Sequence, residues 1–133
     1  MIIPTLSFGG ASVGITYTKQ LFEYALVTDA VNGSRVLFFM NLVLKTKGTS
    51  IGAAMISLDP GHPAPPLGTE QFVARSKFIK INQPGSYYLG LYAAITDAGF
   101  ALRKWGDDCD SMALTDADFR DTSQINFGGS YRI

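Results

Sequence analysis

The sequence is poor in the residues from which most enzyme and metal sites are built. It has one cysteine, Cys109, and one histidine, His62. A lone cysteine excludes an internal disulfide, and a lone histidine excludes a site made of several histidines within one chain. His62 stands in a proline-rich segment with no nucleophile-elbow motif, so no Ser/His/Asp triad is predicted. We therefore assign no catalytic residue, expect no cofactor or metal, and predict that the chain is not an enzyme.

Carboxylate residues are also few in some regions and clustered in others. Glu23 and Glu70 are the only glutamates, and a glycosidase needs two facing carboxyl groups at a fixed separation, for which the sequence offers no credible pair. Aspartates instead gather near the C-terminal end, where six of the eleven acids lie between residues 105 and 124: Asp107, Asp108, Asp110, Asp116, Asp118 and Asp121. The run lacks the EF-hand glycine and terminal glutamate, so a solvated acidic loop is favoured over a calcium site.

Net charge and long apolar runs are absent as well. Eleven basic residues balance eleven acidic ones, which argues against nucleic-acid or anionic-membrane binding, because both favour a basic face. The start of the chain has no basic region before an apolar stretch, so a signal peptide is not predicted. The longest apolar run, residues 36–44, is interrupted by Asn41 and is too short to span a bilayer. The 133 residues fit one domain, residues 1–133.

The periodicity is that of β-strands. In residues 35–45 one side is apolar throughout: Val36, Phe38, Met40, Leu42 and Leu44. The other side is apolar in its middle and polar at its ends: Arg35, Leu37, Phe39, Asn41, Val43 and Lys45. A strand that is apolar on both sides is expected to be buried on both. One side would meet an opposing sheet, and a neighbouring subunit is a natural cover for the other.

Further strands are predicted at residues 16–28, 50–58, 71–81, 86–96, 100–105 and 123–133. Turns separate them, including an Asn-Gly hairpin signal at Asn32-Gly33 and a Pro-Gly turn within residues 82–85. Residues 59–68 contain four prolines and form a long crossing, and residues 112–119 allow one short helical turn capped by Thr115. No segment has a sustained helical period. The pattern predicts an all-β fold, an antiparallel β-sandwich or jelly roll.

Two groups of candidate functional residues follow. The first comprises candidates for a subunit interface: Leu37, Phe39, Val43, Arg75 and Lys77. Arg75 and Lys77 either cover apolar neighbours with their long stems or meet a carboxylate or small anion at a symmetry mate. The second comprises candidates for surface or ligand binding: Tyr92, Arg103, Trp105, Asp107, Asp108 and Asp110. Their aromatic rings could stack on sugars, although aromatics at strand spacing more often belong to a core.

Both ends of the chain resemble a known kind of module. The similarity rests on residues 14–17 (Gly-Ile-Thr-Tyr), 36–39 (Val-Leu-Phe-Phe) and 44–56 (Leu-Lys-Thr-Lys-Gly-Thr-Ser-Ile-Gly-Ala-Ala-Met-Ile). It continues at residues 114–119 and 123–133, which resemble a closing strand. These patterns are similar to the C-terminal knob or tip domains of bacteriophage tail needles and tail fibres. Between residues 59 and 110 only the strand rhythm agrees.

The resemblance implies a β-sandwich knob that assembles with two identical subunits into a homotrimer. It implies a virion tip, made in the host cytoplasm, that contacts a bacterial surface component such as lipopolysaccharide or the outer membrane during attachment or penetration. A small anion at the subunit interfaces is a further expected partner, and nucleic acid is not. The alternatives are a carbohydrate-binding or carbohydrate-cleaving fibre tip, and a capsid decoration or adhesion domain. The chain is also expected to be a piece of a longer protein, because needles of this kind carry a coiled coil upstream.

Overall fold

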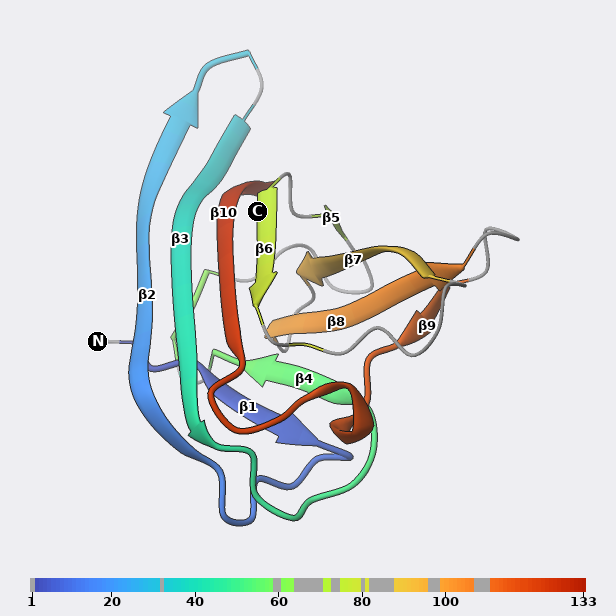
Figure 1. Cartoon of the computed structure of the whole chain (residues 1–133). Helices are drawn as coiled ribbons and strands as arrows, with labels where there is room; N and C mark the ends of the chain where they lie inside the picture. Colours follow the sequence, from blue (N-terminus) through green and yellow to red (C-terminus); the bar gives the residue numbers. More distant parts are fainter. Residues whose placement is uncertain are drawn as a thin grey trace.

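The computed structural model describes residues 2–31, 33–58, 61–63, 71–72, 75–79, 81, 88–95, 99–106 and 111–133. Within these ranges, strand residues 71–72, 75–79, 88–94, 105–106 and 111 are described by their backbone pairing alone. Almost every element is a strand (Figure 1): β1 (Thr5–Phe8), β2 (Thr16–Asp29), β3 (Gly33–Thr46), β4 (Ala54–Ser57), β5 (Gln71–Phe72), β6 (Arg75–Ile79), β7 (Tyr88–Ile95), β8 (Gly99–Gly106), β9 (Ser111–Ala113) and β10 (Gln124–Arg132). One 3-10 turn, η1 (Asp116–Asp118), lies between β9 and β10. No helix in the described part of the chain is long and apolar enough to cross a membrane.

The strands form two antiparallel sheets. Sheet A has the order β1-β4-β8-β7-β5, with β9 also paired to β8, and sheet B has the order β2-β3-β10-β6. Figure 1 shows the strands of sheet B running side by side while β1, β4, β8 and β7 cross them. The predicted all-β antiparallel class is confirmed.

One core lies between the sheets. The even-numbered side of β3 is buried from Val36 to Leu44, as the alternation predicts. Sheet A meets it with Phe100, whose ring centroid lies 5.2 Å from that of Phe38 and 5.1 Å from that of Phe127. These tilted contacts are the arrangement that aromatic pairs prefer. Residues of both sheets therefore belong to a single hydrophobic cluster.

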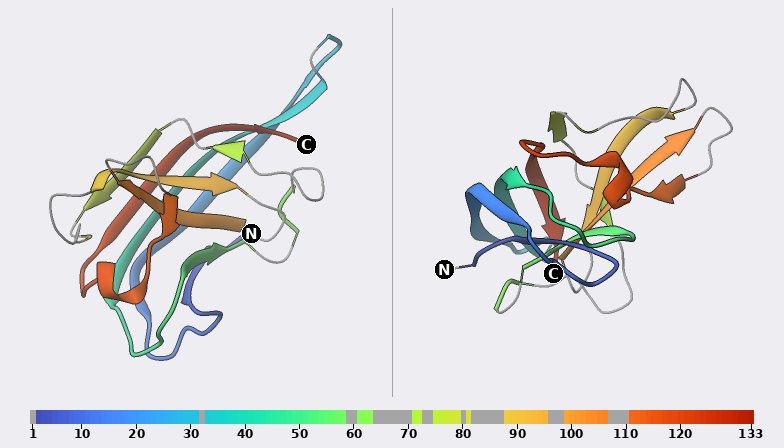
Figure 2. Two further views of the ribbon diagram at one scale, coloured as in Figure 1. Left: turned by 90° about the vertical axis from the view of Figure 1, so that its right-hand side faces the viewer. Right: turned by 60° about the horizontal axis from the view of Figure 1, so that its bottom comes forward.

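The β2–β3 hairpin is the longest pairing among the described strands. Its register runs from Thr16 opposite Thr46 to Asp29 opposite Gly33. The turn is held by the Asp29 carboxylate, which accepts a hydrogen bond of 2.7 Å from the N–H of Val31. Gly33 follows with φ of 77°, a conformation that glycine adopts at little steric cost. The Asn-Gly signal thus marks a hairpin, and the tip of this hairpin extends beyond the other strands (Figures 1 and 2).

The strand predicted at residues 71–81 is wrong in one respect, because the segment is divided between the two sheets. β5 pairs with β7 in sheet A, whereas β6 pairs with β10 in sheet B. A period of two residues shows which residues share a side but does not show where a chain changes sheets. The predicted strand at 50–58 is also too long, since β4 begins at Ala54. The short strands β1 and β9 were not predicted.

Close backbone packing explains the late start of β4. A Cβ atom on Gly48 would overlap the Val13 carbonyl oxygen, and one on Gly52 would lie 2.6 Å from the Cα of Gly9. The Ser50 hydroxyl accepts a hydrogen bond of 2.8 Å from the N–H of Val13. The loop before β4 is therefore pressed against the loop after β1, and glycine at these points permits the contact.

A buried ion pair fixes the turn before β10. The ammonium of Lys104 on β8 lies 3.0 Å from both carboxylate oxygens of Asp118, and the two side chains are only 7% and 1% exposed. The same carboxylate accepts a hydrogen bond of 2.9 Å from the N–H of Thr115. The predicted short turn with Thr115 at its N-cap is confirmed. It attaches the segment after β9 to the inner side of β8.

Candidate functional site

One open part of the described structure is the side of sheet B that faces away from the core. Because directly opposed residues of an antiparallel pair lie on one face, the register defines this outer face of sheet B. It comprises the odd-numbered residues of β2 from 19 to 27, those of β3 from 35 to 45, the odd-numbered residues of β6, and the even-numbered residues of β10.

The centre of this face is apolar and uncovered. Leu37 and Phe39 are 48% and 43% exposed, whereas Val43 is partly buried. Opposite Leu37 and Phe39, β10 places only Ser130 and Gly128, which are too small to cover them. Within the described part of a single chain nothing covers these two side chains, so there β3 is buried on one side only, and cover of its second side by a neighbouring subunit stays a prediction.

Sheet pairing brings all five subunit-interface candidates onto this one face. Arg75 pairs with Gly128, which in turn pairs with Phe39. Lys77 pairs with Asn126 in the next row along the strands. The sequence alone gave no relation between β3 and β6, because the register passes through β10.

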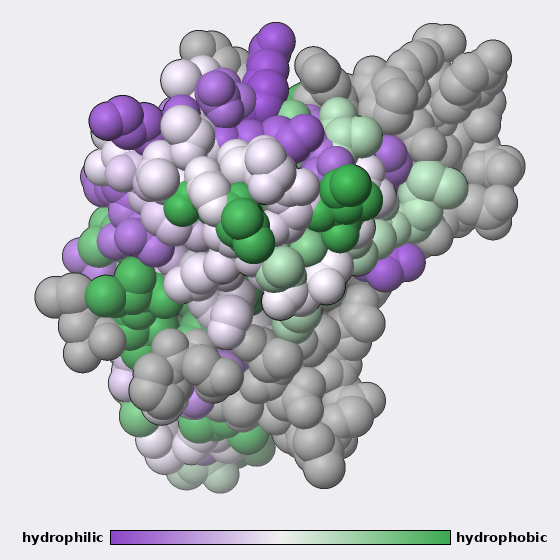
Figure 3. All heavy atoms as spheres, turned by 90° about the horizontal axis from the view of Figure 1, so that it is seen from below, coloured by the Kyte–Doolittle hydropathy of each residue, from purple (hydrophilic) through white to green (hydrophobic). Residues whose placement is uncertain are grey.

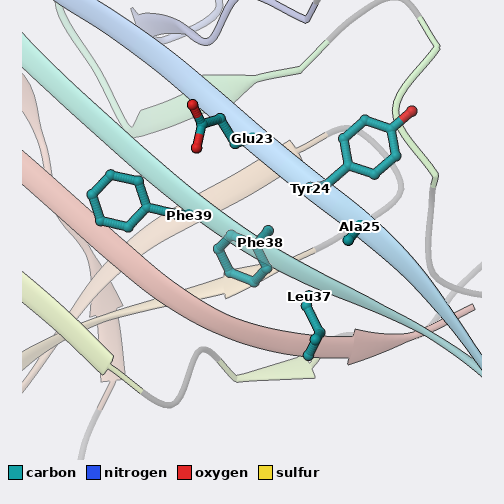
Figure 4. Close-up of a pocket in the computed structure, with 6 residues that line it drawn as sticks. All are labelled: Glu23, Tyr24, Ala25, Leu37, Phe38 and Phe39. Atoms are coloured by element: carbon teal, nitrogen blue, oxygen red, sulfur yellow. The ribbon is translucent and has the colours of Figure 1, made fainter.

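A shallow open hollow of about 340 Å³ lies along the outer half of the β2–β3 hairpin. Figure 4 shows the residues that line it: Glu23, Tyr24, Ala25, Leu37, Phe38 and Phe39. Glu23 lies directly opposite Phe39 and Ala25 directly opposite Leu37. The hollow combines exposed apolar surface with one carboxylate and holds no pair of facing acids.

The charge of this face is strongly one-sided. Its rows carry six of the eleven basic residues: Lys19, Arg35, Lys45, Arg75, Lys77 and Arg132. They carry one of the eleven acids, Glu23, and the next row, at the tip of the hairpin, adds Asp29 opposite Gly33. The zero net charge of the chain therefore conceals a basic face. Because of this face, the balanced composition does not exclude an anionic partner.

Several polar groups on this face lack partners within the chain. Asn41 and Asn126 lie directly opposite one another, and the side-chain oxygen of each is buried without a hydrogen bond. The Nε of Arg35, also on this face, is buried without one. Among described residues the only other such atom is Nε2 of His62. A buried polar atom without a hydrogen bond costs roughly 1–3 kcal/mol. On this face, therefore, polar atoms lack hydrogen bonds and apolar side chains lack cover.

The second candidate group lies on the opposite outer surface, that of sheet A. On β8, Phe100, Leu102 and Lys104 are buried. Arg103 and Trp105 alternate with them and therefore lie on the outer face. Arg103 pairs with Tyr92 and Ala113, and Trp105 pairs with Gly90 and Ser111. The backbone thus brings Tyr92, Arg103 and Trp105 to one face, while Asp107, Asp108 and Asp110 lie outside the described residues.

The loop end of the molecule differs from both faces. Val13 and Ile51, in the loops after β1 and β3, are 64% and 79% exposed. Figure 3 views this end from below, and its hydrophobic residues appear as separate spots among hydrophilic ones. Scattered exposed apolar residues of this kind are normal on a soluble surface and mark no site.

Titratable groups in the described residues do not gather into a group that could hold a metal ion. Groups of three or more His, Cys, Asp or Glu side chains close enough to hold a metal are not found there. Burial raises the pKa of Tyr131 to about 12, with a further contribution from Tyr24. The Tyr131 hydroxyl donates to the carbonyl oxygen of Pro63, which is a structural role. Burial also raises the pKa of Tyr17, whose hydroxyl accepts a hydrogen bond of 2.8 Å from the N–H of Leu6.

The ion pair between Lys104 and Asp118 was missed by the sequence-based prediction. One signal was available, because the alternation of Phe100, Leu102 and Lys104 places a lysine on the buried side of β8. A buried lysine requires a carboxylate partner. The choice of Asp118 among the clustered aspartates follows only from the folded path of η1.

Comparison with known proteins gives no relative. The chain matches no family model, no curated protein and no solved structure.

Proposed function

We propose that the chain is a non-enzymatic virion tip domain, the knob of a phage tail needle or the head of a tail fibre. It forms a homotrimer and contacts the host cell surface during attachment or penetration. The similarity of both chain ends to such modules supports this proposal. The observation that carries it is the uncovered apolar centre of the outer face of sheet B at Leu37 and Phe39.

Assembly accounts for that face physically. Burial of apolar surface contributes roughly 25 cal/mol for each Å² removed from water. Two half-exposed large side chains at the centre of a face, with partly buried Val43 beside them, therefore favour association with another copy. Three copies would also present three identical contacts to a cell, which strengthens weak binding by avidity.

The test is binding to the host surface. Labelled protein would be applied to bacterial cells, to purified lipopolysaccharide on a glycan array, and to a reducing-end assay for glycan cleavage. We expect binding to cells without release of reducing ends. Phe39→Glu, which places a charge at the centre of the face, should reduce cell binding through loss of avidity. Release of reducing ends by the purified protein would contradict the non-enzymatic assignment.

A carbohydrate-binding tip is the second candidate, and the outer face of sheet A favours it. There the register brings two aromatic residues and Arg103 together, a combination suited to stacking on and hydrogen bonding with sugars. Glycan binding that is lost in Arg103→Ala but retained in Phe39→Glu would assign the sugar contact to this face. The two candidates are compatible, because the faces lie on opposite sides of the molecule.

A further inference from the structure

Strand β2 is an open edge of sheet B. Among the described strands it pairs with β3 alone. An edge strand presents backbone N–H and C=O groups that can pair with another strand, and proteins usually protect such an edge with proline, a bulge or a covering segment. The bulges of β2 lie between Thr16 and Lys19, and from Lys19 to Asp29 the strand is regular and contains neither proline nor glycine. This part of the edge is therefore suited to pairing with a further strand.

The distal half of this edge is exposed on both of its faces. Every residue from Glu23 to Val31 is exposed. Even on the side of β2 that faces sheet A, Tyr24 and Leu26 are 44% and 58% exposed. The reason is visible in Figures 1 and 2, where the β2–β3 hairpin extends beyond the other strands and β2 is the outermost strand of sheet B. A strand added beside β2 would cover part of this apolar surface.

The sequence of β2 is complementary to itself in one antiparallel register, the one in which Tyr24 of one copy lies opposite Tyr24 of another. Lys19 then lies opposite Asp29 at both ends of the pairing. Opposite charges and apolar side chains that face each other directly stabilise antiparallel strands. The pairs between the two ends are Gln20 with Thr28, Leu21 with Val27, Phe22 with Leu26, and Glu23 with Ala25.

Other registers lose this match. A pairing centred one residue earlier sets the two Glu23 carboxylates opposite one another, and like charges in that position destabilise a sheet. A pairing centred one residue later sets Asp29 opposite Leu21. Centres at residue 22 or before either extend the pairing into the bulges that precede Lys19 or leave the exposed distal half unpaired. Charge and apolar complementarity thus favour one register of one edge.

We propose that the β2 edge binds the β2 edge of a second copy of this chain, antiparallel and centred on Tyr24. The contact would continue sheet B from one copy into the next. It is isologous, so it joins copies only in pairs. It is therefore a different contact from that through Leu37 and Phe39, and it does not depend on the proposed trimer. Because it involves one strand of each copy, it is small, and we expect it to form at concentrations well above the micromolar range.

Cysteine cross-linking tests the register. In chains whose one cysteine is replaced (Cys109→Ser), Tyr24→Cys places two thiols directly opposite one another. Thr28→Cys, on the same side of β2, places them eight residues apart along the strands, about 26 Å. A short bifunctional thiol reagent, with the protein at millimolar concentration, should therefore join Tyr24→Cys chains about tenfold faster than Thr28→Cys chains. A mixture of Gln20→Cys and Thr28→Cys chains should react like Tyr24→Cys, because those two positions are opposed.

Charge exchange tests the two ends of the pairing. Lys19→Glu and Asp29→Lys should each slow the cross-linking of Tyr24→Cys chains about tenfold, because two opposite-charge pairs become two like-charge pairs. A one-to-one mixture of these variants restores opposite charges at both ends, so cross-linking between unlike chains should return to the rate without charge changes. Lys19→Arg is the matched control that keeps the charge and the rate, and circular dichroism would confirm folding of each variant.

The same cross-linking in a Phe39→Glu background separates this inference from the proposed trimer. Loss of the trimer with retained cross-linking of Tyr24→Cys would leave the edge contact standing. Equal cross-linking of Tyr24→Cys and Thr28→Cys chains, or none of either, would overturn the edge contact whether or not the trimer forms. Absence of cross-linking together with cosedimentation of the natural chain with phosphatidylglycerol vesicles would overturn it in favour of a lipid surface as the partner of the exposed hairpin.

Discussion

The inner side of β8 and the outer face of sheet B differ in how well one chain satisfies their side chains. On β8 the alternation turns Lys104 inward, where Asp118 receives it at 3.0 Å. On β3 and β10 the same alternation leaves Leu37 and Phe39 half exposed, and the side-chain oxygens of Asn41 and Asn126 without hydrogen bonds. An internal ion pair neutralises the buried charge of the first region, whereas the second keeps exposed apolar side chains and polar atoms without hydrogen bonds. Among the described residues, the outer face of sheet B combines exposed apolar side chains with buried polar atoms that have no hydrogen bond.

The largest expected effect comes from breaking the incomplete face. Phe39→Glu should abolish the trimer, because a buried carboxylate in place of an apolar ring removes roughly 2–3 kcal/mol of favourable burial at each interface and adds a desolvation penalty. All three interfaces of a ring would be affected at once. The matched change on the other face, Arg103→Glu, should leave the trimer intact. Sedimentation velocity would measure both, and equal loss of assembly in the two variants would end the distinction between the faces.

The completed region is tested by removing one member of its ion pair. Asp118→Ala should lower the free energy of unfolding by about 3–5 kcal/mol, since it removes the carboxylate that neutralises the buried charge of Lys104. Chemical denaturation would measure the loss. The double variant Lys104→Met/Asp118→Leu should regain most of it, because a buried ion pair replaced by apolar residues is often neutral. A double variant as unstable as Asp118→Ala would show that the pair is not the cause.

Alkaline pH tests the burial of Tyr131 on the inner side of β10. The pKa of Tyr131 is about 12 in the folded protein, against 10.0 for an ordinary tyrosine. Between these pH values the Tyr131 hydroxyl loses its proton in the unfolded chain and keeps it in the folded chain. Stability should therefore be unaffected below pH 10 and fall by at most about 2–3 kcal/mol by pH 12. Tyr131→Phe should remove this part of the decline, and denaturant midpoints across that range would show it; an unchanged decline would contradict a buried Tyr131.

The smallest effect concerns the unpartnered amides. In a monomeric Phe39→Glu background, Asn41→Leu should raise the free energy of unfolding by about 1 kcal/mol, because it removes a buried oxygen that has no hydrogen bond. In the natural background the same change should weaken the proposed trimer. Thermal unfolding of both pairs would test this. A loss of stability in the monomer would mean that Asn41 is already satisfied within one chain.

Much of the fold follows from the sequence. The alternation over residues 36–44 predicted the buried side of β3, Asn32-Gly33 predicted the hairpin, and Thr115 predicted the cap of η1. The predictions failed where they concerned which sheet a segment joins. Nothing in the local pattern shows that residues 71–81 change sheets, because alternation is the same in either sheet.

The sequence predicted which residues are candidates for the two faces, but not which of them share a face. Leu37 and Phe39 stood out because they are apolar on a side that no other element was predicted to cover. Arg75 reaches their face only through the pairing of β6 with β10 and of β10 with β3. The basic character of the face has the same origin, since its cations come from four strands that are distant in sequence. Composition, which sums the charges of the whole chain, hides such segregation.

The most direct test of the central claim is the mass of the natural chain in solution. Light scattering coupled to size exclusion, at micromolar concentration and low salt, should give three times the 14.4-kDa mass of the chain. A mass of 14.4 kDa under these conditions would show that the apolar centre at Leu37 and Phe39 stays uncovered in solution and would contradict the account.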